Sequence, residues 1–435
     1  MTKRSFPAAL LCLGLACGAF AAPQDKLTLK QCVDLILAQS DQVKMAAESV
    51  TGAELRIAES KSLYWPTASL SANYLRNSFF GSFKFPMDGK DVLIKFGLAN
   101  SYRAALAVNG VIFSWGRVAR TVDMSRAGLS LAQDGVDMAK HMLGYQVVPI
   151  FFGTVFFREA IQVLEENRKA FQKRLVIMTE RYKAGLASSF ETSLIQVQMA
   201  SLESQKIDFE NNIAKFRIAF NALAGRPEEA PFEPDARLEF QAASYRRDDL
   251  LKEAAANRVE FRQVEQQVSL NQVSLNLART ANKPTVAAAF NYEFRNGFMP
   301  VVEEIHGNWT AALTVSYPAF DGFRAKTQVA QAESTLKQAE FRRGDVEKSV
   351  TIEIESALSD LKTAERKLDI EKIKIKQAED ALRIAEERFQ SGLLSATDLV
   401  DAQNAVESAR LNALQLVYGH ILAEYTLFRA CGRKL

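Results

Sequence analysis

Residues that commonly carry chemistry are few in this sequence. The three histidines, His141, His306 and His420, are scattered and form no metal-ligand motif. The sequence also lacks a G-x-S-x-G nucleophile motif and a phosphate-binding loop. We therefore predict that the protein is not an enzyme and that it holds no cofactor and no metal ion.

One acidic pair stands out. Asp398 and Asp401 lie three residues apart, on one face and in the first turn of a predicted helix. An acid in that turn usually offsets the helix dipole. In a symmetric assembly, however, each aspartate becomes a ring of carboxylates, and such rings select cations.

The segment that carries this pair occurs twice. Residues 180–196 repeat the skeleton of residues 387–403, and the offset is constant because 387 − 180, 392 − 185 and 403 − 196 all equal 207. The chain is therefore predicted to be two tandem copies of one unit. In each copy a glycine, Gly185 or Gly392, supplies the left-handed conformation that ends one helix. Ser188 or Ser189, and Ser395 or Thr397, can cap the next helix.

The elements around these hairpins are long helices. From residue 322 to 391 apolar residues recur every three and four positions, which predicts a helix about 100 Å long. Its narrow apolar stripe is typical of coiled-coil packing. In the first copy, Pro149 and a run of phenylalanines predict a kink or a local repacking. Shorter helical patterns cover residues 29–62 and 248–281.

Four segments alternate with a period of two, which predicts strands at about 67–79, 101–113, 285–295 and 308–318. A loop joins each pair. Apolar residues on one side and small polar ones on the other fit a sheet between lipid and water, or a half-buried sheet of a soluble protein. Aromatic residues near the strand ends favour the membrane: Tyr74, Tyr102, Tyr292, Phe294 and Trp309. Because four strands cannot close a barrel, a membrane sheet requires several chains.

The domain boundaries follow from these patterns. Residues 1–22 read as a signal peptide, with Ala19-Phe20-Ala21 as the cleavage site; a membrane anchor and lipidation at Cys17 are less favoured alternatives. The first repeat covers 23–225 with a hairpin at about 184–189, a linker covers 226–245, and the second repeat covers 246–435 with a hairpin at about 391–397. Cys32 and Cys431 either pair or remain buried thiols. With 54 basic and 51 acidic residues, nothing indicates nucleic-acid binding.

At this point the chain resembles the TolC-like outer membrane efflux proteins. Each copy reads helix, proline, strand, loop, strand, F-x-x-x-R, long helix, G-L hairpin and long helix, and Asp398-x-x-Asp401-Ala-Gln is similar to the family's most characteristic stretch. The resemblance implies a mixed α and β homotrimer with a twelve-stranded barrel in the outer membrane lipid of a Gram-negative bacterium and a periplasmic helical tunnel. It also implies a periplasmic adaptor protein and, through it, an inner membrane transporter.

The resemblance further implies roles for individual residues. Gly185, Leu186, Gly392 and Leu393 would contact the adaptor, and Asp398 and Asp401 would form the periplasmic gate together with Glu191. Because the first copy has Glu191 and Leu194 where the second has the two aspartates, the gate is expected to be asymmetric. The expected function is the exit duct of a tripartite efflux or type I secretion system. The alternative is a secreted or periplasmic coiled-coil scaffold.

Overall fold

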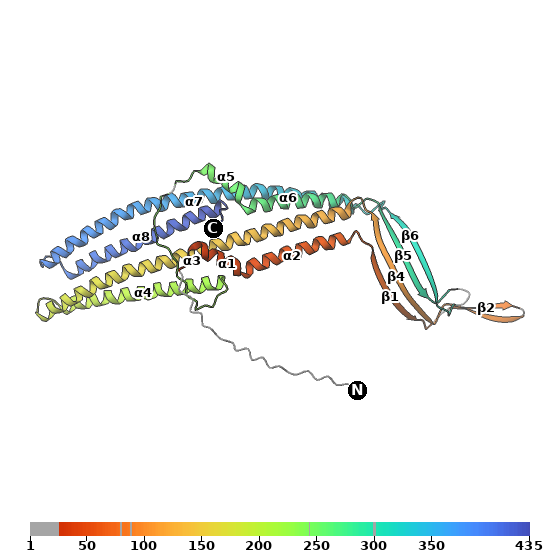
Figure 1. The fold of residues 1–435 in the computed structure, drawn as a ribbon, viewed down its shortest axis with the longest axis horizontal. Coiled ribbons are helices and arrows are strands. Elements are labelled where there is room, and N and C mark those ends of the chain that lie inside the picture. The colour runs from red at the N-terminus through yellow and green to blue at the C-terminus, as the bar shows by residue number, and fades with distance from the viewer. Residues whose placement is uncertain (1–25, 79–80, 88, 243, 299–301) are drawn as a thin grey trace, which may run out of the picture.

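The computed structural model describes residues 26–78, 81–87, 89–242, 244–298 and 302–435. The predicted signal peptide, Cys17 included, lies outside these residues. The molecule is elongated, with strands at one end and paired helix ends at the other (Figure 1).

Two copies of one element order make up the chain. The first consists of α1 (Leu29–Gln39), α2 (Asp41–Ser62), β1 (Thr67–Arg76), β4 (Asn100–Phe113), α3 (Arg117–Lys183) and α4 (Ser189–Leu223). The second consists of α5 (Arg247–Asn257), α6 (Val259–Ala278), β5 (Thr285–Arg295), β6 (His306–Ser316), α7 (Arg324–Gln390) and α8 (Ala396–Ala430). α3 and α7 each have 67 residues, and α4 and α8 each have 35.

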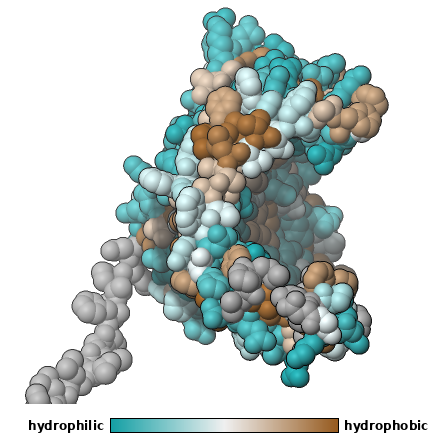
Figure 2. All heavy atoms as spheres, turned by 90° about the vertical axis from the view of Figure 1, so that its right-hand side faces the viewer, coloured by the Kyte–Doolittle hydropathy of each residue, from teal (hydrophilic) through white to brown (hydrophobic). Residues whose placement is uncertain are grey.

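The long strands form one antiparallel sheet in the order β1-β4-β5-β6. Its register brings the apolar positions of all strands onto one face, with Leu70 opposite Leu106, Leu106 opposite Tyr292, and Tyr292 opposite Trp309. The other face carries small and polar residues such as Ser69, Asn291 and Thr310. Viewed from this end, the molecule exposes hydrophobic side chains (Figure 2).

The helices continue the order of the sheet. α2 packs against α3, α3 against α6, and α6 against α7, as β1, β4, β5 and β6 do. Farther from the sheet, α4 pairs with α3, α3 with α8, and α8 with α7. One side of the molecule is therefore bounded by β6 and α7, and the other by β1, α2 and α4 (Figure 1).

Three expectations need correction. The segment between β1 and β4, predicted as a loop, contains a hairpin of β2 (Gly81–Met87) and β3 (Lys90–Phe96). The helix predicted over 29–62 is interrupted at Ser40, whose hydroxyl accepts from the N–H of Gln42 and so starts α2. The helix predicted over 248–281 is likewise interrupted at Arg258, in extended conformation, and ends at Ala278.

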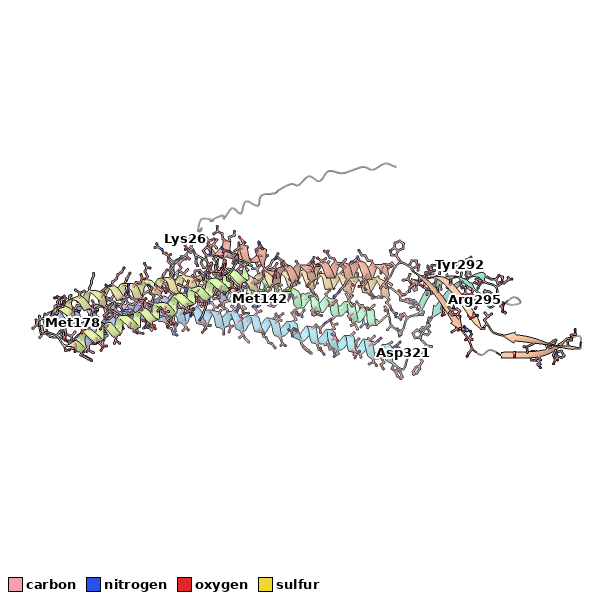
Figure 3. The ribbon with its side chains drawn as sticks, turned by 90° about the horizontal axis from the view of Figure 1, so that it is seen from below. Lys26, Met142, Met178, Tyr292, Arg295 and Asp321 are labelled. Atoms are coloured by element: carbon pink, nitrogen blue, oxygen red, sulfur yellow. The ribbon has the colours of Figure 1, made fainter. Side chains whose placement is uncertain are left out.

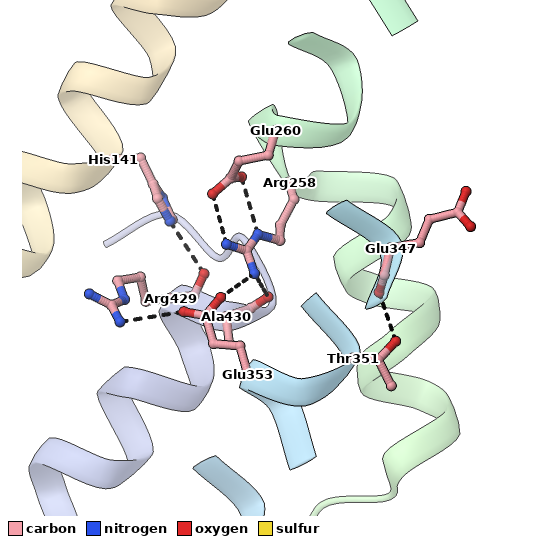
Figure 4. Close-up of polar contacts among 8 residues, drawn as sticks. All are labelled: His141, Arg258, Glu260, Glu347, Thr351, Glu353, Arg429 and Ala430. Atoms are coloured by element: carbon pink, nitrogen blue, oxygen red, sulfur yellow. Dashed lines mark hydrogen bonds and ion pairs between the residues drawn. The ribbon is translucent and has the colours of Figure 1, made fainter. Parts of the chain in front are cut away.

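Arg258 joins three elements at this break. Its guanidinium donates to both carboxylate oxygens of Glu260, at 3.1 and 2.7 Å, and to Glu353 of α7 at 2.6 Å (Figure 4). It also donates to the carbonyl of Ala430 at the end of α8. Burial is the largest single influence on Glu260 and raises its pKa, but the hydrogen bonds and the charge of Arg258, together with a backbone hydrogen bond, leave the pKa lowered. A buried guanidinium with this many partners fixes α5 and α6 against the long helices.

Among the described residues, hydrophobic packing is divided among three clusters along the molecule. Cys32 lies in one and Cys431 in another, and both are buried free thiols. Burial raises the pKa of Cys431 to about 11 and that of Cys32 to about 12, so neither is reactive near neutral pH.

By length and composition, α3 contains a stretch that could cross a membrane. Its apolar residues around Pro149 are instead core residues, because Val147, Phe151 and Val155 are buried in the described structure. The helix runs unbroken through Pro149, whose carbonyl accepts from the Tyr418 hydroxyl of α8. The phenylalanines of this run pack against α4 and α8: the ring of Phe156 stacks on Tyr418, and that of Phe157 lies tilted against Phe209.

Candidate functional site

The two hairpin tips have the same backbone design. Gly185 has φ +75° and Gly392 has φ +73°, and no atom outside the adjoining chain lies within 4 Å of a Cβ placed on either. The N–H of the following leucine returns to the carbonyl five residues back, Leu186 to Arg181 at 2.8 Å and Leu393 to Arg388 at 2.9 Å. This is the Schellman arrangement, in which a glycine ends the helix.

The leucine after each glycine is exposed to solvent. In this motif it commonly packs back on the last turn of its helix. Here Leu186 is 79% exposed and Leu393 is 78% exposed. Each tip thus presents a bare apolar side chain at the far end of the molecule from the sheet.

The acid that follows each tip is the partner of the residue that caps the next helix. Glu191 accepts from the N–H of Ser188 at 2.8 Å. In the second copy the Ser395 hydroxyl accepts from the N–H of Asp398 and donates to its carboxylate at 2.7 Å. The caps left open by the sequence are therefore Ser188 and Ser395, and Asp398 has a local structural role.

Asp401 has no such role. It is exposed and makes no ion pair among the described residues, whereas Leu194, its counterpart in the first copy, packs against the core. Leu399 and Val400 between the two aspartates are buried. Asp398 and Asp401 therefore share an exposed face of α8, while Glu191 lies on the other hairpin.

The two hairpins meet through apolar and polar contacts. Met178 and Ile195 of the first hairpin pack with Ala396 and Val400 of the second. Farther along, Asn167 of α3 donates to Glu407 of α8 and accepts from Gln403 at 2.6 Å. All three side chains are buried, and burial raises the pKa of Glu407, with the Asn167 hydrogen bond opposing it.

Aromatic residues lie at both ends of the sheet. The five predicted ones gather at the loop end. There the ring centres of Tyr74 and Tyr102 are 5.2 Å apart, and those of Tyr292 and Phe294 are 5.1 Å apart. The sequence reading missed a second group at the helix end. All its members are exposed: Trp65, Trp115, Tyr317, Phe320 and Phe323.

The spacing of the two aromatic groups fits a bilayer. Trp309 and Tyr317 are 317 − 309 = 8 residues apart, or about 26 Å along the strand at 3.3 Å per residue, which is about 20 Å of height at a barrel-strand tilt of about 40°. An outer membrane barrel has an apolar band about 25 Å tall between aromatic girdles. The sequence did contain a signal for the second group, namely the aromatic residues in the turns that follow β4 and β6. In the structure two of them, Trp115 and Phe323, have positive φ, 54° and 65°, which is unfavourable for an aromatic residue.

The polar face of the sheet carries charge at its loop end. Glu293 lies 2.7 Å from the Arg103 Nε and 3.2 Å from the Arg295 Nε. Its side chain is 8% exposed and those of both arginines are about half exposed. Charged groups on this face require water beside it rather than lipid.

An amphipathic sheet with aromatic girdles, continued by long helices, defines a membrane channel protein. A family model described as "Outer membrane efflux protein" matches residues 32–226 and 250–433. The chain belongs to the outer membrane efflux protein family, as the sequence predicted. It is therefore an outer membrane component of an efflux system, and its family is one of transport ducts rather than enzymes.

Curated relatives support this assignment at low identity. The chain is 20% identical over 399 residues to nodulation protein T of Rhizobium leguminosarum bv. trifolii, covering 88% of this chain and 80% of that protein. It is 20% identical over 424 residues to the pyoverdine export outer membrane protein OpmQ of Pseudomonas putida, covering 95% of this chain and 87% of the relative.

Solved structures share the fold. VceC of Vibrio cholerae matches with a TM-score of 0.75 at 16% identity over 93% of this chain and 96% of its own. The Campylobacter jejuni CmeC outer membrane channel matches with a TM-score of 0.74 at 17% identity over 99% of this chain and 94% of its own.

The capping geometry separates the two aspartates. Asp398→Ala is expected to destabilise the second hairpin by about 0.5–1 kcal/mol, because it removes the partner of Ser395 and an acid at a helix start. Asp401→Ala should change stability by less than about 0.5 kcal/mol. Hydrogen exchange of the first turn of α8 measures both, and equal protection in the two variants would contradict the capping role.

Proposed function

We propose that three copies of this chain form a closed channel. The observation that carries the proposal is that both sides of the molecule are open along its length. β1 and β6 each pair on one side only within the described sheet. In hydrocarbon, unpaired backbone groups are not tolerated, so β6 of one copy must pair with β1 of the next. Three copies would give 3 × 4 = 12 strands.

The helical part supports the same arrangement. α7 exposes a stripe of large apolar residues at intervals of 11, 18 and 3, which lie within about a quarter of the helix circumference at 100° per residue. These residues are Phe341, Ile352, Ile370 and Ile373. On the opposite side of the molecule, α2 and α4 expose Leu55, Val197 and Ile207. One side of a copy would thus cover the other side of its neighbour.

A charge placed in the α7 stripe tests the trimer. Phe341→Glu is expected to weaken assembly, because the carboxylate would be buried against a neighbouring copy. Phe341→Leu keeps the side chain apolar and should assemble normally. Sedimentation in detergent and the heat-dissociable oligomer band on a gel measure the change. An unaltered trimer for Phe341→Glu would show that α7 is not the interface.

The resulting channel would be the exit duct of a tripartite system. The apolar face of the sheet would meet lipid, and the helices, about 100 Å long in α3 and α7, would extend into the periplasm. The bare leucines Leu186 and Leu393 would then lie at the periplasmic mouth, where a periplasmic adaptor joined to an inner membrane transporter would dock. Relatives named for export of pyoverdine and for efflux of toluene favour a small-molecule pump over secretion of proteins.

A cysteine at the tip tests adaptor docking. Leu393→Cys introduces an accessible thiol without straining the left-handed glycine beside it, and the native thiols of Cys32 and Cys431 are buried. We expect a cross-link from this position to a periplasmic adaptor in intact cells, detected by co-purification. Gln328→Cys, exposed near the sheet end of α7 and on a different face from the apolar stripe, is the control. Equal cross-linking from both positions would argue against docking at the tips.

The same mouth would hold the gate. Repeated in three copies, Asp398 and Asp401 would give two rings of carboxylates, with Glu191 adding charge from the first hairpin. Because Leu194 is apolar, the second hairpin would supply most of the charge.

Charge neutralisation tests the gate. Asp398→Asn with Asp401→Asn is expected to reduce cation preference and block by divalent cations in planar-bilayer recordings. Glu191→Gln should have the smaller effect, since its copy has only one acid. Unchanged selectivity and block in the double variant would remove the aspartates from the gate.

A further inference from the structure

A pocket lies between the two hairpins, close to their tips. It has a volume of about 300 Å³, at the lower end of the range for small-molecule sites. Its walls come from four helices: α3, α4, α7 and α8. Met178, on its α3 side, lies near the hairpin end of the molecule (Figure 3). The lining comes from both hairpins.

The floor of the pocket is apolar and fixed. Met178, Ile195, Ala396, Leu399 and Val400 are each less than 6% exposed. They belong to both hairpins, so an apolar body resting on this floor would touch the first and the second hairpin at once.

The rim of the pocket is cationic. Lys173, Arg174 and Arg181 come from two turns of α3, and Glu386 of α7 is the only acid in the lining. The lining therefore carries three positive charges and one negative charge. Neighbouring like charges on one helix face repel one another, and a bound anion would relieve that repulsion.

The three cations are incompletely paired. Arg174 donates through Nη2 to Glu386 at 2.5 Å, but its Nη1 is buried and has no hydrogen-bond partner in the described structure. Arg181 lies over the ring of Phe389, 5.1 Å from its centre. Lys173 has no ion-pair partner among the described residues and is exposed. A buried guanidinium nitrogen without an acceptor is costly, so turning the Arg174 side chain toward an anionic oxygen in the pocket would satisfy Nη1.

From this combination we propose that the pocket binds an amphipathic anion. A carboxylate, sulfate or sulfonate group accepts from Arg174 Nη1 and Lys173, and its apolar body lies against Phe389 and the buried floor. Because the ligand contacts α3 together with α7 and α8, its binding holds the two hairpins in the arrangement of this structure.

A matched pair of fluorescent probes tests the site. 8-Anilino-1-naphthalenesulfonate carries the required anion, and N-phenyl-1-naphthylamine is nearly the same molecule without it. Titrated into the full-length protein in nanodiscs, with empty nanodiscs subtracted, the sulfonate is expected to bind saturably with one site per chain. The uncharged probe should bind at least tenfold more weakly.

Variants locate the binding. Arg174→Gln should weaken sulfonate binding about tenfold, and Ile177→Glu, an exposed change on the rim, should weaken it by repulsion without disturbing the core. Lys169→Gln, one turn away on α3 and outside the lining, is the control and should leave binding unchanged. Equal affinity for the two probes, or sulfonate binding unaffected by both Arg174→Gln and Ile177→Glu, would overturn the proposal. Either result would leave the channel and adaptor proposals intact.

Discussion

The unpaired backbone of β1 and β6 is the constraint on which the rest of this structure depends. In hydrocarbon every N–H and C=O needs a protein partner, so the sheet of one chain is incomplete in the membrane. The helices continue the strands in the same order, so the outermost helices also have a neighbour on one side only. The exposed apolar stripe of α7 is therefore the helical counterpart of an open strand edge. A single chain leaves both the strand edges and the α7 stripe uncovered.

The two copies share a backbone but divide their side-chain roles. Both tips use a left-handed glycine, an exposed leucine and a serine cap. Beyond the cap they differ, since Leu194 packs into the core between the hairpins whereas Asp401 remains exposed. The first hairpin also supplies the three cations of the pocket rim, and the second supplies Glu386 and most of the floor. Duplication thus provides the geometry, and divergence gives the first hairpin Lys173 and Arg174 where the second has Asp380 and Ala381.

Much of the fold could be predicted because its elements are long and regular. Alternation over ten or more residues identified the apolar face of the sheet, and the register confirms it. The interruptions at Ser40 and Arg258 were missed because neither has a glycine or proline, and the apolar rhythm continues on both sides. The β2–β3 hairpin was missed although Asp88-Gly89 between alternating segments is a hairpin signal in the sequence. The pocket could not be predicted, because Arg174 and Glu386 are brought together only by packing.

The lengths of the two copies record where this architecture tolerates change. Equivalent residues before the sheet differ by 285 − 67 = 218, and after it by 324 − 117 = 207, so the copies differ by 11 residues between their strands and by none along the helices. An insertion of one residue in α3 alone would shift its tip by about 1.5 Å and turn it by about 100° relative to the tip of α7. Insertions and deletions are thus expected to accumulate in the segments that join the strands. The long helices are expected to keep a common length, which places the two tips at the same distance from the sheet.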